Sequence, residues 1–134
     1  IFQTNPAQIS IDQGAEHLKC LRLKPKGTLR WYAGCCNTPI GNTMNAKMPF
    51  VGLIHTIMGE GRERASGPVQ IHVQTQDALP GLAADLENEG FPKSITRRIM
   101  RKILWWKLTG KARPNPFFDK DGKPVSKPGI VNSA

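Results

Sequence analysis

Alternating apolar and polar residues predict β structure in the first third of the chain. The segment 17–23 divides between two faces, with Leu18, Cys20 and Arg22 on one and Lys19, Leu21 and Leu23 on the other. Lys24-Pro25-Lys26-Gly27 follows and predicts a tight turn, because Pro fits the first central position and Gly supplies a positive φ. With the segment 28–32 it predicts a β-hairpin that brings Cys20 roughly opposite Tyr32. A shorter alternating stretch, 7–11, predicts another strand.

The middle of the chain predicts a mixture of elements. The segment 34–43 is crowded with Gly, Asn, Thr and Pro, which predicts a structured loop and not a regular ladder. The segment 49–58 places apolar residues at helical spacing after a Pro, which favours a short helix and leaves a buried strand as the alternative. Clean alternation over 69–74 predicts a half-buried strand, and 79–86 predicts a brief helix that exits through 87–91.

The clearest element is a helix over 94–109, with Ser94 as candidate N-cap and Gly110 as its end. Steps of 100° place two different sets of residues on the two halves of the helical wheel. The apolar half holds Ile95, Ile99, Met100, Ile103, Leu104 and Trp106, and the other half holds Arg97, Arg98, Arg101, Lys102 and Trp105. Lys107 and Leu108 fall on the wrong sides. Beyond the helix we expect an irregular tail, attached to the body by Phe117 and Phe118.

Together these elements predict an α+β fold that is rich in β structure. The chain has 134 residues, 39% of them hydrophobic, which suits one folded domain over 1–134 and excludes a wholly disordered chain. No apolar run reaches the roughly 18 residues that cross a bilayer. Within the domain we expect a hairpin and cysteine loop over 1–43, mixed structure over 44–91, a basic amphipathic helix over 92–110 and an irregular tail over 111–134.

The start of the chain and its cysteine content predict a cytoplasmic location. No basic and apolar leader opens the sequence, and three cysteines are an odd number for a secreted disulfide framework. The chain begins at Ile1 without Met, inside a segment that already resembles a strand. We therefore expect that preceding residues are missing from this sequence.

The net charge of +9 is local to the predicted helix and its flanks. Eight basic residues and no acidic one lie between positions 93 and 113, whereas the rest of the chain has 11 basic and 10 acidic residues. A helix that packs its apolar face on the core and leaves the charged face in solvent explains this pattern as well as binding does. The alternative is an anion-binding surface for nucleic acid or an anionic membrane. Its candidate residues are Arg97, Arg98, Arg101, Lys102 and Trp105.

The three cysteines do not form a recognisable metal motif by spacing alone. Zinc sites typically use pairs of Cys separated by two residues, and Cys35 and Cys36 are adjacent, so their side chains diverge. Cys20 approaches the same loop across the predicted hairpin, while His17 lies nearer the other end of its strand. Spacing alone favours three free thiols that pack as small hydrophobic residues, with a metal site as the alternative.

Other combinations of residues suggest weaker chemistry. A nucleophile and base could be built from Cys35 or Cys36 with His55 or His72, although nothing in the sequence brings them together. The segment 59–62 lacks the Lys-Ser/Thr ending of a phosphate loop, and 119–122 lacks the closing Glu of a calcium loop. We interpret both segments as turns.

The stretch from Leu18 to Thr43 resembles a known family. Its most telling part is Leu-Arg-Trp-Tyr-Ala-Gly-Cys-Cys-Asn-Thr-Pro-Ile-Gly-Asn-Thr, residues 29–43. This is the zinc-binding family of glutathione-dependent formaldehyde-activating enzymes and centromere-protein-V-like proteins, and more closely an uncharacterised bacterial branch of it. The segments 48–55 and 114–119 also resemble that branch, so the similarity extends over most of the chain. The resemblance implies a β-rich, tent-like fold stapled by zinc.

The resemblance also implies candidate zinc ligands. The family's Cys-x-x-Cys-Gly-x-Pro knuckle aligns with residues 33–39, so Cys36 falls on its second ligand and Ala33 replaces the first. Cys35 is a possible substitute. In the family, one N-terminal cysteine motif holds the catalytic zinc, and an N-terminal Cys-x-Cys pair holds a structural zinc together with the knuckle. Neither motif has a counterpart here, so they either precede Ile1 or are lost. If they are lost, the activity cannot be transferred.

The resulting prediction is a small bacterial protein related to the formaldehyde-activating family but without its complete catalytic site. We expect it to bind zinc or a small thiol compound near Cys20, Cys35 and Cys36; any activity would be of the carbon–sulfur lyase type. The alternative is the anion-binding module of the basic helix. A third possibility is a homo-oligomer whose subunit interface replaces the missing zinc staple.

Overall fold

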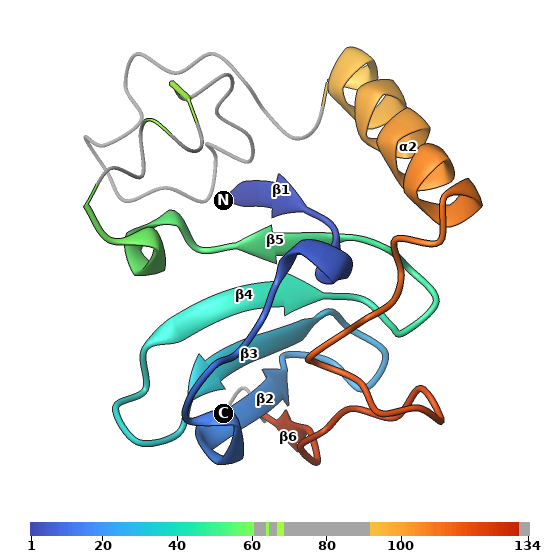
Figure 1. Ribbon diagram of the computed structural model, residues 1–134. Helices are drawn as coiled ribbons and strands as arrows, with labels where there is room; N and C mark the ends of the chain where they lie inside the picture. Colours follow the sequence, from blue (N-terminus) through green and yellow to red (C-terminus); the bar gives the residue numbers. More distant parts are fainter. Residues whose placement is uncertain (61–63, 65–66, 69–91, 132–134) are drawn as a thin grey trace.

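The computed structural model describes residues 1–60, 64, 67–68 and 92–131, and in these residues it has an α+β fold dominated by one sheet (Figure 1). This confirms the expected fold class. The six described strands are β1 (Phe2–Thr4), β2 (Leu18–Arg22), β3 (Leu29–Ala33), β4 (Pro39–Thr43), β5 (Val51–Leu53) and β6 (Gly129–Ile130). Their order in the sheet is β1-β5-β4-β3-β2-β6, and all neighbours are antiparallel except β2 and β6.

The predicted hairpin is confirmed as β2 and β3. Its turn is closed by the Gly27 N–H, which donates to the Lys24 carbonyl at 2.9 Å. Two details of the prediction are wrong. Gly27 is absent from the residues with positive φ, because it occupies the last turn position and not a central one. Cys20 pairs with Trp31, one residue away from the expected Tyr32.

Three expectations for the neighbouring segments need correction. The stretch 7–11 is not a strand, since Pro6–Gln8 forms a 3-10 turn. The segment 34–43 is a loop only in its first half, and its second half is β4, which is hydrogen-bonded between β3 and β5. The helix favoured over 49–58 is replaced by β5 and a 3-10 turn, His55–Met58, so the strand alternative is correct for the first part. Pairing with neighbouring strands of the sheet overrode the local propensity in both places.

One face of the sheet carries the core. Leu18, Cys20, Leu29, Trp31 and Val51 are buried there, at 5% exposure or less. The opposite face is more polar and open, as antiparallel sheets permit: Lys19 and Arg30 on it are exposed.

The residue at the centre of the core is Trp31. Its indole Nε1–H donates to the Thr43 hydroxyl on the neighbouring strand at 2.8 Å, so its buried polar group is satisfied.

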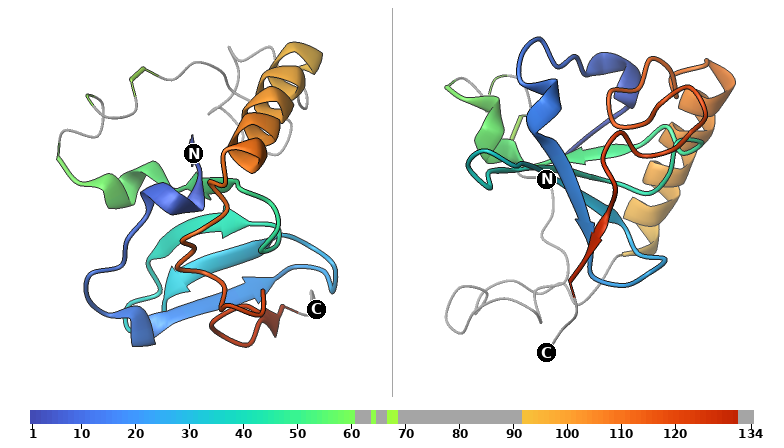
Figure 2. Two further views of the ribbon diagram at one scale, coloured as in Figure 1. Left: turned by 45° about the vertical axis from the view of Figure 1, so that its right-hand side comes forward. Right: turned by 90° about the horizontal axis from the view of Figure 1, so that it is seen from below.

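The C-terminal tail, residues 111–131 of the described chain, covers the core face. Phe117 and Phe118 are buried against Trp31, with ring centroids at 5.1 and 6.0 Å, which confirms that they attach the tail to the body. The segment 119–122 is a turn, as expected, in which the Asp119 carboxylate accepts two backbone N–H groups. The tail then returns along the sheet edge as β6. Figure 2 shows how it runs across the strands before β6 pairs with β2.

The basic helix is α2 (Lys93–Leu108), which agrees with the prediction to within a residue at each end. The cap residue is Pro92 and not Ser94, which lies inside the first turn, and no side chain caps the N-terminus. The helix stops just before Gly110, as predicted, and Gly110 has a φ of 72°. The N–H groups of Gly110 and Lys111 donate to the carbonyls of Lys107 and Trp106, a Schellman motif that only a left-handed residue allows.

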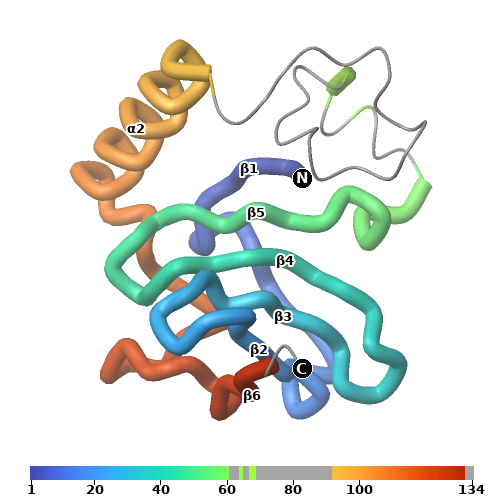
Figure 3. The backbone as a smooth tube through the Cα atoms, turned by 180° about the vertical axis from the view of Figure 1, so that it is seen from behind, coloured from blue at the N-terminus to red at the C-terminus, as the bar shows by residue number. Residues whose placement is uncertain are grey.

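The expected packing of the apolar face of α2 on the core is not found in the described residues, because no residue of α2 belongs to the core cluster or to the partly buried hydrophobic residues packed against it. Ile95, Ile99, Ile103 and Trp106 are half-buried, and no residue of the helix is buried. Met100 and Leu104, expected on the packed face, are 55% and 59% exposed. The helix stands beside the sheet beyond β1 and β5 and does not lie across the core face (Figures 1 and 3). The strand expected over 69–74, the helix over 79–86 and the second half of the 59–62 turn lie outside the described residues.

Candidate thiol site and basic helix

Cys20 belongs to the core and not to a site with the other two thiols. It is 3% exposed, and its Sγ donates to the Ser126 carbonyl of the tail at 3.2 Å. Burial raises the pKa of its thiol above the ordinary value, and the nearby Arg22 charge offsets this only in part. The thiol is therefore protonated and inaccessible in the folded chain, although it was predicted to be a candidate ligand.

Cys35 and Cys36 are exposed on the turn that joins β3 to β4, which we call the Cys turn (residues 33–38). The Ala33 carbonyl accepts the N–H groups of Cys36 at 3.3 Å and Asn37 at 2.7 Å, and Asn37 takes the left-handed φ of 58°. Asn is one of the few residues with a side chain that tolerates this left-handed conformation. The Thr38 carbonyl accepts the N–H of Ala33 at 2.9 Å. The turn thus holds two neighbouring thiols at the surface.

The hydrogen bonds of the Cys turn separate the acidities of its two thiols. The Cys36 Sγ lies 3.1 Å from the Thr38 hydroxyl, and that hydroxyl, the Thr38 backbone N–H and the Cys35 thiol lower the pKa of Cys36. Cys35 Sγ donates to Cys36 Sγ at 3.7 Å, and this bond raises the pKa of Cys35. Cys36 is consequently the thiol that ionises first, and Cys35 remains its proton donor.

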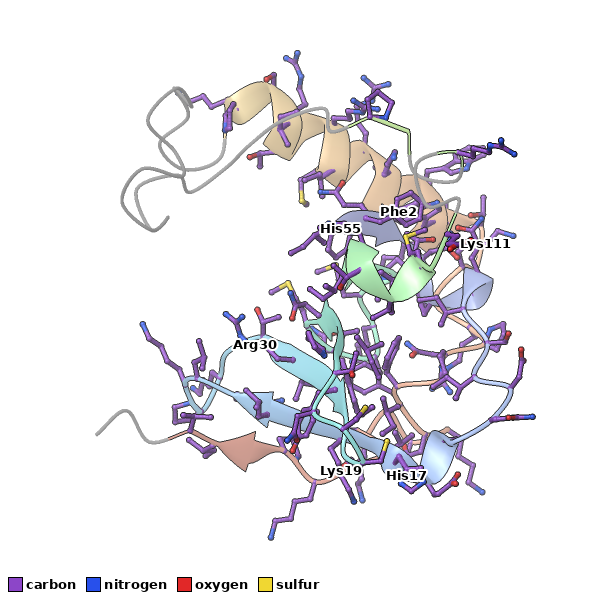
Figure 4. The ribbon with its side chains drawn as sticks, turned by 90° about the vertical axis from the view of Figure 1, so that its left-hand side faces the viewer. Phe2, His17, Lys19, Arg30, His55 and Lys111 are labelled. Atoms are coloured by element: carbon purple, nitrogen blue, oxygen red, sulfur yellow. The ribbon has the colours of Figure 1, made fainter. Side chains whose placement is uncertain are left out.

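The start of β2 lies next to the Cys turn. The Gly34 N–H donates to the His17 carbonyl at 2.7 Å, and Glu16 contacts the His17 ring at 3.5 Å. Figure 4 shows His17 and Lys19 near the lower end of the view and His55 well above them, near Phe2. The pairing of Cys35 or Cys36 with His55 therefore has no support, and His72 lies outside the described residues.

Sequence reasoning missed two neighbours of the thiols, Thr38 and His17. The hairpin register could have found His17, since pairing Leu18 with Ala33 brings residue 17 opposite residue 34. Thr38 has no comparable signal, because its approach to Cys36 depends on the conformation of Asn37 between them.

The described residues do not form a complete metal site. Within 1–60, 64, 67–68 and 92–131, no three side chains of His, Cys, Asp or Glu lie close enough to hold one ion. The sheet pairing separates buried Cys20 from exposed Cys35 and Cys36, so the three candidate ligands are not brought together. A tetrahedral zinc site needs four donors, and the Cys turn offers two neighbouring sulfurs. The zinc implied by the resemblance does not fit these residues alone.

The predicted anion-binding residues all lie on α2 and are exposed. Trp105 is 65% exposed, and Lys102 lies over the Trp106 ring with its Nζ 5.9 Å from the centroid. Arg113, beyond the helix, is used differently, because its guanidinium donates to the carbonyls of Asp119 and Lys120 and so orders the tail.

Within the described part of the chain, no helix has the length and apolar character needed to cross a bilayer. A comparison with curated proteins and a comparison with solved structures each found no match. A protein-family model matches residues 1–128, which is nearly the whole chain, and its description is a family of unknown function, DUF6151. The chain therefore belongs to the DUF6151 family of unknown function.

Proposed function

We propose that this chain binds a small thiol compound covalently at the Cys turn, through Cys36. The observation that carries the proposal is the pair of exposed thiols whose hydrogen bonds lower the pKa of Cys36 and raise that of Cys35. Reactive cysteines are exposed thiols whose anion is stabilised by its surroundings. Cys36 meets both conditions, and Cys20 meets neither.

The bond would form by thiol–disulfide exchange with a small disulfide. The Cys36 thiolate attacks one sulfur, a new S–S bond joins Cys36 to that half, and the other half leaves as a thiolate with the electron pair of the broken bond. The second thiol, Cys35, has its Sγ 3.7 Å from that of Cys36. Its attack on the Cys36 sulfur would break the mixed disulfide, release the bound compound as a thiol and form a Cys35–Cys36 disulfide, which a further small thiol would reduce. A cytoplasmic location would keep both thiols reduced between such events.

The proposal also includes a relationship to the formaldehyde-activating family. It is supported by the sequence of the Cys turn, in which Cys36 corresponds to a ligand of the family's knuckle. Zinc binding would need donors in addition to Cys35 and Cys36, from residues outside the described ranges or from another chain. The proposal concerns binding and transfers no lyase activity, because similarity of fold does not supply chemistry.

Replacing Thr38 by Val is expected to move the midpoint of the pH–rate profile for Cys36 alkylation upward. Val keeps the shape of the side chain but loses the hydroxyl that stabilises the thiolate. Thr38→Ser retains the hydroxyl and is the matched control. The measurement is the rate of iodoacetamide modification between pH 6 and 10, in a Cys35→Ser background so that a single exposed thiol reports.

Alkylation with iodoacetamide also counts the accessible thiols, and incubation with a small disulfide tests the binding. In the folded protein Cys36 is expected to react first and Cys35 more slowly, because the pKa of Cys36 is lowered and that of Cys35 is raised. Cys20 is expected to react only after denaturant is added. Incubation with a small disulfide such as oxidised glutathione is expected to add one thiol unit at Cys36 by mass spectrometry, and Cys36→Ser to abolish it. Equal rates for Cys36 and an unfolded-peptide thiol, or modification at Cys35 alone, would contradict the proposal.

A metal measurement separates the thiol proposal from the zinc alternative. The zinc alternative would be supported if the purified protein bound zinc stoichiometrically and Cys36→Ser lost it. Bound zinc would also slow alkylation of Cys36. Zinc-free protein that still forms the mixed disulfide would support the thiol proposal.

A further inference from the structure

The outer surface of α2 carries a line of exposed aliphatic side chains. Met100, Leu104 and Leu108 follow one another at intervals of four residues, which places them along one side of the helix. Their exposed fractions are 55%, 59% and 75%, and Trp105 beside them is 65% exposed. Scattered exposed apolar residues are ordinary, but a continuous line of them marks an interaction surface.

This aliphatic line is different from the half-buried stripe of the helix. The half-buried residues are Ile95, Ile99, Ile103 and Trp106. With steps of 100° per residue, Leu104 lies about 140° around the helix from Ile99. The aliphatic line therefore lies outside the half-buried stripe, among the exposed residues of α2.

Basic residues flank the aliphatic line on both sides. Lys93, Arg97, Arg101 and Lys107 lie within about 60° of Leu104 around the helix, and all four are exposed. No acidic residue lies between positions 93 and 113. Long Lys and Arg side chains can extend their charges away from an apolar contact while their stems remain in it.

The charge of this surface decides between its possible occupants. A second copy of α2 would bring like charges together, and like charges repel. Nucleic acid would satisfy the cations with phosphate, but it would leave the three aliphatic side chains without an apolar partner. An anionic lipid surface satisfies both, because headgroup phosphates meet the cations and acyl chains receive the aliphatic groups.

We propose that α2 lies lengthwise on the surface of a bilayer that contains anionic phospholipid. The aliphatic line enters the boundary between headgroups and acyl chains, and Trp105 sits at headgroup level, where Trp is enriched. The helix spans about 24 Å at 1.5 Å per residue, enough for several headgroup contacts along its axis. It stands beside the sheet, so the sheet does not block this approach (Figure 3).

The test is sedimentation of the full chain with vesicles of phosphatidylcholine alone or with one third phosphatidylserine. We expect binding to the anionic vesicles only, weakened by salt. A blue shift of tryptophan emission should accompany binding and report chiefly Trp105, the exposed tryptophan, because Trp31 is buried and Trp106 is already half-buried. Replacing Arg97, Arg101 and Lys107 by Gln should weaken binding about a hundredfold, since each charge contributes about fivefold near such a surface.

Two further variants distinguish the occupants. Leu104→Gln with Leu108→Gln keeps every charge, and the proposal requires it to lose the blue shift and most of the vesicle binding. The control variant Lys24→Gln, Lys26→Gln, Lys127→Gln removes the same charge elsewhere. It should bind nearly as well as the original protein. Unchanged binding of the Leu variant, equal binding to neutral vesicles, or tighter binding to a DNA duplex than to anionic vesicles at equal salt would overturn the proposal. All substituted positions are exposed, and circular dichroism checks folding.

Discussion

Replacing Phe117 by Ala is expected to lower the free energy of unfolding by about 3–5 kcal/mol, the usual cost of deleting a buried aromatic side chain. Phe117 is fully buried, and its ring lies 5.1 Å from the ring of Trp31 at the centre of the core. Deletion leaves a cavity beside Trp31 and releases the contact that holds the tail on the sheet. The measurement is urea unfolding followed by tryptophan fluorescence.

The control for this substitution is an aromatic residue with no buried contact. Trp105→Ala removes a larger side chain that is 65% exposed, and it should change the free energy of unfolding by less than about 0.5 kcal/mol. Phe117→Leu keeps most of the apolar volume and should fall between the two. If Phe117→Ala and Trp105→Ala had similar small effects, the tail would not be part of the core.

Replacing Gly41 by Ala is expected to cost about 1–3 kcal/mol, the range for forcing an extra group into a packed interior. A Cβ at this position would lie 2.9 Å from the Gly52 carbonyl oxygen and 3.3 Å from the Leu53 side chain. The carbonyl belongs to the backbone of β5, which pairs with β1 on one side and β4 on the other, so it cannot move without disturbing the ladder. Denaturant unfolding of this variant measures the cost.

Gly52→Ala, on the neighbouring strand β5, is a matched control. Its Cβ would approach the Ile1 side chain at 2.8 Å, but Ile1 is terminal and 70% exposed, so it can turn away. We expect Gly52→Ala to be much milder than Gly41→Ala. The reverse order would mean that β4 and β5 do not approach each other as closely as described.

The hairpin and the basic helix could be predicted because their signals are local. Alternation over 17–23 and the turn at Pro25 define β2 and β3 without knowledge of the rest of the chain. The end of α2 at Gly110 likewise follows from the few residues around it. The attachment of the tail by Phe117 and Phe118 followed from their hydrophobicity alone, although their partner Trp31 did not.

Strands whose own residues do not favour β structure were mispredicted. Gly41 and Asn42 are poor strand formers, yet they form β4 because β3 and β5 supply hydrogen bonds on both sides. The short apolar segment 51–53 was ambiguous between helix and strand, and its pairing with β1 and β4 decided the matter. Sequence periodicity contains no information about which strand will lie alongside.

The candidate sites divide in the same way. The order of the residues alone located the excess positive charge on one helix, because charge and helical spacing can both be read along the chain. Only the tertiary structure separated Cys20 from Cys35 and Cys36, through sheet pairing that turned one thiol into the core and left two on a turn. It also brought Thr38 to Cys36 and left Met100, Leu104 and Leu108 exposed. Burial and hydrogen bonding depend on neighbours that the chain acquires only when it folds.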